Sequence, residues 1–123
     1  MSRESRMVEK LFRKLSGRPK KPFPQEHQPL QAPTEQAVNV IRKSGAVLHV
    51  GRTLRGKKGL HQRLRNHLYG ISSFAEKFLN GDGALLRKGC TYQYLVVKDA
   101  RMRALLEAFA VGRLCPRHIG LGK

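Results

Sequence analysis

Five of the six prolines in this 123-residue chain fall within residues 17–33, in the run GRPKKPFPQEHQPLQAP. Proline lacks a backbone N–H and favours extended backbone, so this run cannot continue a helix. It predicts a division of the chain at residue 34. Residues 1–34 are expected to form a basic amphipathic helix and a Pro-rich arm or linker, and residues 35–123 are expected to form the folded domain.

Residues 1–34, which we call the leader, begin with apolar side chains at helical spacing and basic side chains between them. The apolar set is Met7, Val8, Leu11, Phe12 and Leu15. A basic helix followed by a Lys-rich extended arm can neutralise DNA phosphates without a fixed fold. It can equally be a solvated tail, dock a protein partner or lie on a membrane surface. The sequence leaves these alternatives open.

The charge balance restricts the partners of the chain. Lys and Arg total 25 against 8 Asp and Glu, a formal net charge of +17. Such a surplus repels itself unless a polyanion neutralises it. We therefore expect nucleic acid as the partner, DNA more than RNA, with an anionic membrane surface or an acidic protein as the competitor. A homodimer or a larger protein partner is a further option. No stretch approaches the ~18 apolar residues of a membrane span, so the expected location is intracellular, cytoplasmic or nucleoid-associated.

Two β-rich runs, residues 37–41 and 46–50, predict a hairpin because a turn-like stretch, Arg-Lys-Ser-Gly, separates them. With the turn centred on Ser44, Asn39 would lie opposite His49. Both side chains would then leave the same face of the sheet.

The remaining pattern predicts a helix at about residues 60–69, a short helix after a capping box from Ser73 to Glu76, and a third strand over residues 91–97. Asp99 is placed to cap a final helix, whose buried face would carry Met102, Leu105, Leu106 and Phe109. The expected fold class is therefore α/β in the α+β sense, with three strands and flanking helices.

Three runs, LHVGRT, GLHQRLRNHL and LLEAFAVGRLCP, resemble the three signature blocks of the GIY-YIG nuclease superfamily. The resemblance covers about residues 36–119 and implies a small three-stranded antiparallel sheet flanked by helices. His49-Val50-Gly51 stands where the family has Tyr-Ile-Gly or Tyr-Val-Gly, so His49 replaces one motif tyrosine. Asn39 stands in place of the other. The chain resembles a divergent member of the superfamily.

The resemblance also implies site residues. The family's catalytic arginine corresponds to Arg63, and its Arg-x-x-x-His variant adds His67. The family's metal-binding glutamate lies nine residues before a proline, a spacing that Glu107 and Pro116 share. Ile119 stands where many members carry an asparagine. The implied cofactor is Mg²⁺ or Mn²⁺, held by Glu107.

These residue types suit phosphodiester hydrolysis, which needs an activated water, a cation near the phosphate and stabilisation of the developing charge. Glu107 can bind Mg²⁺ together with water and phosphate oxygens. Arg63 can donate two hydrogen bonds to a phosphate. His49 or His67, with a reference pKa near ~6.5, can act as general base, and Asn39 can orient water.

Each of these residues also has a structural interpretation. Glu107 follows Arg103 by four residues, so the two can form a surface ion pair. Arg63 can belong to a solvated basic face, His67 can lie on a helix surface, and His49 can pack within the hairpin.

The segment from residue 42 to residue 65 contains no Asp or Glu and is rich in basic side chains. Besides Arg63, its predicted nucleic-acid contacts are Arg42, Lys43, Arg52, Arg55, Lys57, Lys58 and Arg65. Because they surround the predicted site in sequence, they are interpreted as a surface that follows phosphates.

The leading hypothesis is a small metal-dependent DNA endonuclease that hydrolyses phosphodiester bonds. One alternative is a catalytically degenerate GIY-YIG-like module that binds nucleic acid without cutting it, since both motif tyrosines are replaced. A second alternative is a basic structural subunit of a nucleoprotein assembly, which the charged leader would suit.

Overall fold

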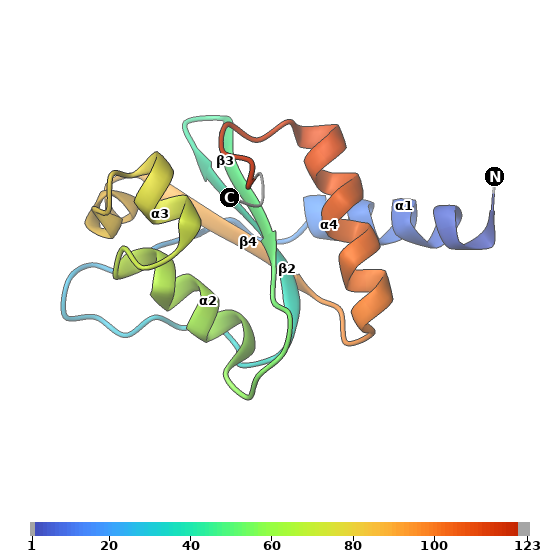
Figure 1. Cartoon of the computed structure of the whole chain (residues 1–123), viewed down its shortest axis with the longest axis horizontal. Coiled ribbons are helices and arrows are strands. Elements are labelled where there is room, and N and C mark those ends of the chain that lie inside the picture. The colour runs from blue at the N-terminus through green and yellow to red at the C-terminus, as the bar shows by residue number, and fades with distance from the viewer. Residues whose placement is uncertain (1, 121–123) are drawn as a thin grey trace.

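A four-stranded antiparallel sheet runs through the middle of the molecule, with helices on both of its faces (Figure 1). The computed structural model describes residues 2–120. The elements along the chain are α1 (Arg3–Ser16), β1 (Lys21–Pro22), β2 (Ala37–Lys43), β3 (Ala46–Arg52), α2 (Gly59–Leu68), α3 (Ser73–Phe78), the 3-10 helix η1 (Gly83–Arg87), β4 (Cys90–Val96) and α4 (Ala100–Leu114). The strand order is β1-β4-β2-β3, which makes β3 an edge strand.

The predicted α+β class and the three predicted strands are confirmed, but the expectation of a three-stranded sheet is wrong. A fourth strand, β1, comes from the proline-rich run, where Lys21 pairs with Tyr92 and Pro22 pairs with Thr91 of β4. A strand of two residues has no periodicity from which it could be predicted. Pro22 is tolerated there because an edge strand does not need every N–H for pairing.

The β2–β3 hairpin forms where predicted, with a different register. Ser44 and Gly45 both have positive φ angles, +50° and +82°, which suits a two-residue hairpin turn. This turn pairs Lys43 with Ala46, and a further one-residue shift between Ile41 and Arg42 places Asn39 opposite Gly51. Since side chains alternate with a period of two, this two-residue displacement keeps Asn39 and His49 on the same face.

The sheet separates two hydrophobic cores. On one face, α2, α3 and η1 cover a core that includes Ile41, Leu64 and Phe74. On the other face, α1 and α4 cover a core that includes Leu15 and Leu106, packed with Val38, Val40 and Val50. All β2 residues from Ala37 to Ile41 are fully buried, because the strand is central and both of its faces are covered.

The leader packs against the rest of the molecule. Phe12 of α1 meets Phe109 of α4 edge to face, with ring centroids 5.3 Å apart. Gln93 of β4 donates to the main-chain carbonyls of Ser16 and Arg18. The division of the chain into domains at residue 34 stays a prediction, but α1 is a packed helix in this structure.

The helix boundaries follow local capping. Asp99 caps α4 as predicted, because its carboxylate accepts the Met102 N–H. The N-cap of α3 is Ser72, which accepts the Ala75 N–H, so the predicted capping residue, Ser73, is displaced by one position. Within residues 2–120, no helix combines the length and apolar character that crossing a membrane requires.

Candidate functional site

Three of the predicted catalytic residues line one pocket of about 420 Å³ beside the edge strand. His49 comes from β3, Arg63 from α2 and Glu107 from α4. Phe74 of α3 and His118, which follows α4, also line this pocket. The fold therefore brings together side chains that are far apart in sequence: His49 and Glu107 are 58 positions apart, and His49 and His118 are 69 positions apart.

Asn39 and His67 are fully buried on the same face of the sheet and do not line this pocket. Both polar atoms of the Asn39 amide and the Nε2 atom of His67 lack hydrogen-bond partners among the described residues. A Cβ atom at Gly51 would lie 2.9 Å from His49 Nε2 and 3.5 Å from Asn39 Oδ1. The glycine therefore preserves a small polar notch between His49 and Asn39.

Burial makes the two predicted histidine bases weak. The pKa of His49 is lowered from 6.5 to about 3, first by desolvation and then by the charges of His118 and Arg63. The pKa of His67 is also well below its ordinary value, mainly because of burial. Its Nδ1 lies 2.6 Å from Ser72 Oγ. Both imidazoles are therefore neutral at neutral pH, able to accept a proton only with a small driving force.

His118 is a site residue that sequence reasoning missed. Its Nδ1 lies 3.1 Å from His49 Nδ1, so one proton can be shared between the two rings. The segment is attached to the edge strand because Arg117 N–H donates to Val47 O and His118 N–H donates to Leu48 O. The one signal in the sequence was Pro116, which ends α4 and returns the chain toward β3.

Glu107 forms an ion pair with Arg52. Arg52 Nη1 donates to Glu107 Oε1 at 2.7 Å, and the two side chains are about a third and a quarter exposed, 32% and 25%. The alternative suggested by spacing, a pair between Arg103 and Glu107, does not form. Arg103 is buried and donates to four main-chain carbonyls, those of Thr53, Leu54, Val97 and Lys98.

The Arg63 guanidinium is partly buried and faces the Glu107 charge. Desolvation lowers the pKa of Arg63, and the Coulombic attraction of Glu107 opposes this effect. The Nε atom of Arg63 is buried and has no hydrogen-bond partner among residues 2–120. An arginine held in this way retains donors for an anionic ligand.

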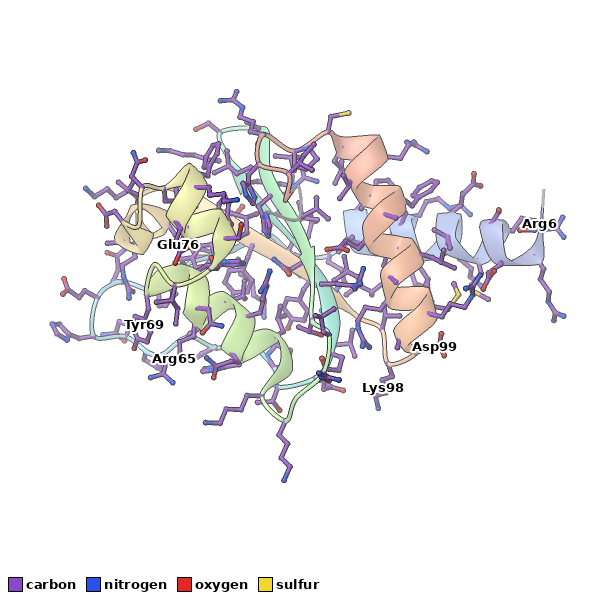
Figure 2. All side chains as sticks on the ribbon, viewed as in Figure 1. Arg6, Arg65, Tyr69, Glu76, Lys98 and Asp99 are labelled. Carbon is purple, nitrogen blue, oxygen red and sulfur yellow. The ribbon has the colours of Figure 1, made fainter. Side chains whose placement is uncertain are left out.

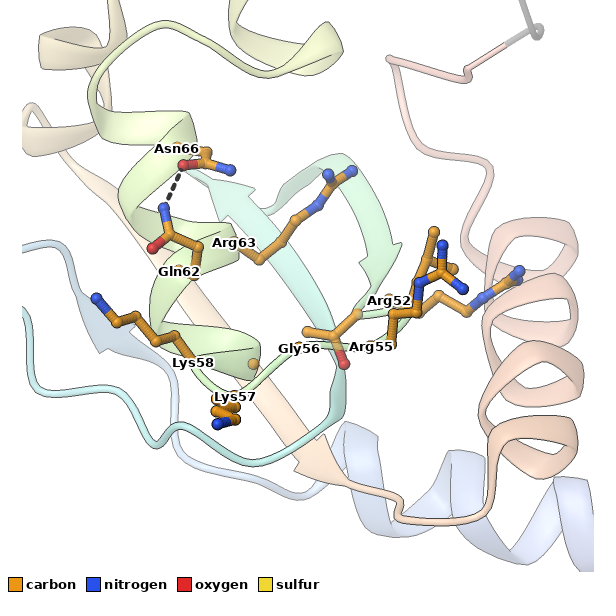
Figure 3. Close-up of a pocket in the computed structure, with 11 residues that line it drawn as sticks. Arg52, Arg55, Gly56, Lys57, Lys58, Gln62, Arg63 and Asn66 are labelled. Atoms are coloured by element: carbon orange, nitrogen blue, oxygen red, sulfur yellow. Dashed lines mark hydrogen bonds between the residues drawn. The ribbon is translucent and has the colours of Figure 1, made fainter.

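Beside this pocket lies a second, larger hollow of about 520 Å³, which we call the basic groove; its basic lining residues are Arg52, Arg55, Lys57, Lys58 and Arg63 (Figure 3). The loop between β3 and α2, residues 53–58, forms part of this lining, and Gln36 supports it by donating to the carbonyl of Gly56. Arg63 lines both hollows, so the groove and the pocket with Glu107 meet at this side chain.

The other predicted nucleic-acid contacts lie outside the groove. Arg42 donates to Gln93 Oε1 within the sheet, at 3.1 Å, and Lys43 is exposed at the end of the hairpin. The Arg65 guanidinium lies over the Tyr69 ring, 5.0 Å from its centroid. These residues are near the groove residues in sequence, but their side chains lie elsewhere in the fold.

A metal ion would depend on Glu107. No three His, Cys, Asp or Glu side chains within the described part of the chain are grouped so that they could hold a metal ion. The Arg52 ion pair uses Glu107 Oε1, which leaves Oε2 outside that pair. A single carboxylate completed by water and phosphate oxygens is a donor set that suits Mg²⁺.

Comparisons of the whole chain identify the fold. No protein-family model matches the sequence, and no curated protein matches it significantly. The structure is similar to the GIY-YIG N-terminal endonuclease domain of UvrC from Thermotoga maritima bound to magnesium, with a TM-score of 0.55 and 23% identity over 73% of this chain and 89% of that chain. A point mutant of the same domain, bound to its catalytic divalent cation, gives a TM-score of 0.55 and 18% identity over 98% of this chain and 100% of that chain. The predicted GIY-YIG-like fold is confirmed.

Proposed function

We propose that this chain is a metal-dependent DNA endonuclease that hydrolyses phosphodiester bonds, with DNA held in the basic groove. The observation that carries the proposal is that Arg63 lines both the groove and the pocket that contains Glu107. A phosphate bound by Arg63 would therefore lie beside the Glu107 carboxylate. The similar UvrC domain, an endonuclease domain bound to magnesium, supports the same interpretation.

Glu107 is the residue that would hold the divalent cation, Mg²⁺ or Mn²⁺. When bound, the cation supplies charge neutralisation at the phosphate and polarises its oxygens. The ion pair with Arg52 keeps the Glu107 side chain at the pocket in the absence of a cation. Because Arg52 also lines the groove, it can turn to a DNA phosphate when Glu107 is engaged elsewhere.

Arg63 would hold the phosphate. Its partly buried guanidinium gives stronger hydrogen bonds to an anion than a fully solvated one, since less water competes for the donors. The neighbouring cations of the groove would bind flanking phosphates. Binding would release the counterions that are condensed on the DNA, so the affinity should fall steeply as the salt concentration rises.

His49 and Asn39 are the groups that would manage the attacking water. With Nδ1 of His49 directed at His118, Nε2 is the atom beside the notch at Gly51. The Asn39 amide, which lacks partners among the described residues, supplies a donor and an acceptor that can orient water there. His67 would not contact the water. It would help to position His49, since the two rings pack at a centroid distance of 5.2 Å.

The test is incubation of the purified full-length protein with supercoiled plasmid and with branched DNA, in Mg²⁺ or Mn²⁺. Glu107→Ala is the test variant and Glu76→Ala is the matched control, since Glu76 is an exposed glutamate on α3 that lines neither hollow. Cleavage by wild type and Glu76→Ala, lost in Glu107→Ala, supports the enzyme. Wild-type cleavage no faster than that of Glu107→Ala overturns it.

A second candidate function is a module that binds nucleic acid without cutting it. The observation that favours it is the buried His49, whose pKa of about 3 makes it a poor base at neutral pH. Glu107 is also already neutralised by Arg52. This function predicts salt-sensitive DNA binding that survives Glu107→Ala, together with no cleavage by the wild type in either metal.

A further inference from the structure

The outer side of α2 continues the basic groove beyond its end. Lys58, Gln62 and Asn66 line the groove at intervals of four residues, and Gln62 Nε2 donates to Asn66 Oδ1 at 2.7 Å (Figure 3). Tyr69 follows Asn66 by three residues, so it lies on the same side of the helix.

Tyr69 is a large aromatic side chain that is 60% exposed. The Arg65 guanidinium lies over its ring at 5.0 Å from the centroid, which restrains the ring while leaving much of it in solvent. Figure 2 shows Arg65 and Tyr69 together at the outer side of α2. Ile71, two residues further on, is 64% exposed and adds apolar surface to the same end of the helix.

The charge around this aromatic favours a polyanion. Residues 54–71 contain no Asp or Glu, and Arg65, which lies outside the groove, places its guanidinium over the Tyr69 ring. A protein partner with an apolar surface would gain nothing from the cation beside Tyr69. An unpaired nucleotide would, because its base stacks on an aromatic ring while its phosphate meets a cation.

We infer that Tyr69 is a stacking platform for the first or second unpaired nucleotide of a DNA strand that leaves the basic groove along α2. The inference rests on the proposed binding of DNA in the groove and makes it more specific. The phosphate backbone of one strand of a duplex would lie in the groove, and that strand would continue past Asn66. The preferred DNA is thus a duplex with a single-stranded extension.

The experiment compares two fluorescently labelled DNA probes by anisotropy at fixed salt, using the full-length protein without divalent metal. One probe is a blunt duplex, and the other is the same duplex with a four-nucleotide extension at one end. Because the polarity of the strand is open, 5′ and 3′ extensions are both tested. The variants are Tyr69→Ala, Tyr69→Phe, which keeps the ring, and Leu85→Ala, which shortens another exposed apolar side chain.

Wild type is expected to bind at least one extended probe more tightly than the blunt duplex, by about 5-fold or more, since one base stacked on an aromatic ring contributes roughly that factor. Tyr69→Ala should lose this preference while binding the blunt duplex as before. Tyr69→Phe and Leu85→Ala should retain it. A 2-aminopurine at the first unpaired position should also be quenched by wild type and not by Tyr69→Ala.

The outcomes separate this inference from the proposed function. Equal binding of blunt and extended probes by wild type overturns the platform and leaves DNA binding in the groove intact. A preference that Tyr69→Ala retains in full also overturns it. Lack of binding to all probes overturns both. The double variant Lys57→Ala with Lys58→Ala should weaken binding to blunt and extended probes alike, because it removes groove contacts only.

Discussion

Arg52 and Glu107 form an ion pair that joins the end of β3 to α4, with Nη1 and Oε1 2.7 Å apart. The pair gives the carboxylate a cationic partner at the position where a divalent ion would bind. Cation binding must therefore compete with Arg52, and an isolated, partly exposed ion pair contributes up to about 1 kcal/mol. This relationship makes the metal affinity of the site adjustable by a residue that is not itself a ligand.

Removing Arg52 is expected to strengthen cation binding. In Arg52→Ala, the Glu107 carboxylate loses its competitor, so the Kd for Mn²⁺ measured by electron paramagnetic resonance without DNA should fall by about 5-fold or less. Arg55→Ala removes another cation of the groove and serves as the control, with little change expected. An unchanged or weaker Mn²⁺ affinity in Arg52→Ala would show that the ion pair does not compete with a metal.

Acid is expected to destabilise the fold through its buried histidines. The pKa of His49 falls from 6.5 to about 3 on folding, so below pH 6.5 the unfolded chain binds a proton that the folded chain does not. The stabilisation is complete above that pH and is lost progressively as the pH falls toward about 3. For His49 alone, the free energy of unfolding should decrease by about 2 kcal/mol between pH 6.5 and pH 5.

Urea denaturation across this pH range measures the effect. His49→Phe should flatten the pH dependence, because it removes the imidazole that titrates. The new ring can still stack on Phe74, as the imidazole does at a centroid distance of 4.6 Å. His27→Ala is the matched control, since the His27 side chain is 91% exposed and the pH dependence should stay that of wild type. A slope in His49→Phe as steep as in wild type would assign the acid sensitivity elsewhere.

The notch at Gly51 should not tolerate a methyl group. A Cβ atom there would lie 2.9 Å from His49 Nε2, so the imidazole must move in Gly51→Ala. Overpacking of this kind costs about 1–3 kcal/mol of stability, and the displaced ring should show changed NMR resonances. Gly112→Ala is the control because nothing lies within 4 Å of its Cβ position and it sits inside α4, where alanine is expected to stabilise by about 0.5–1 kcal/mol. Equal stabilities for the two variants would contradict the tight notch.

The salt dependence of DNA binding should identify the cations that meet phosphates. Each phosphate contact contributes about −0.9 to the slope of log K against log salt concentration, so the double variant Lys57→Ala with Lys58→Ala should reduce the slope by up to about 2. Lys43→Ala removes an exposed lysine at the far end of the hairpin and should change it little. A reduction by Lys43→Ala as large as half that of the double variant would place binding outside the groove.

The sequence was informative where function depends on spacing along the chain. Glu107, nine residues before Pro116, and Arg63, on the first helix after the hairpin, are the positions that the resemblance to the GIY-YIG superfamily implies, and the fold brings them to one pocket. The α2 and α4 helices could be predicted because their apolar positions follow helical periodicity. The Asp99 cap is equally local, since it depends on a residue three positions away.

Features that depend on tertiary contact could not be predicted in the same way. His118 reaches His49 only because its segment hydrogen-bonds to the edge of β3, and no local pattern encodes this pairing. Arg103 was interpreted as a partner of Glu107, yet its donors are used by main-chain carbonyls from two loops. The strand at Lys21 is likewise defined by β4 and has no signature of its own.

The burial of the site histidines could not be predicted from the sequence either. His49 and His67 were considered as bases from their reference pKa, which holds for solvated imidazoles. Packing against Phe74 and against each other removes them from water and lowers both pKa values. A residue type indicates which chemistry is available, whereas its environment decides the pH at which that chemistry operates.

The proposal that Arg63 and Glu107 act on one phosphate is tested most directly by single-turnover cleavage of supercoiled plasmid in Mg²⁺. Glu107→Gln and Arg63→Ala should each reduce the rate by about 100-fold or more, and the double variant should be little slower than either single one, because residues that act as a unit are not additive. Glu76→Gln should cleave like wild type, and DNA binding, measured in parallel, should persist in Glu107→Gln. Cleavage by Glu107→Gln at the wild-type rate would contradict the proposal, as would a wild type that binds the plasmid and never cuts it.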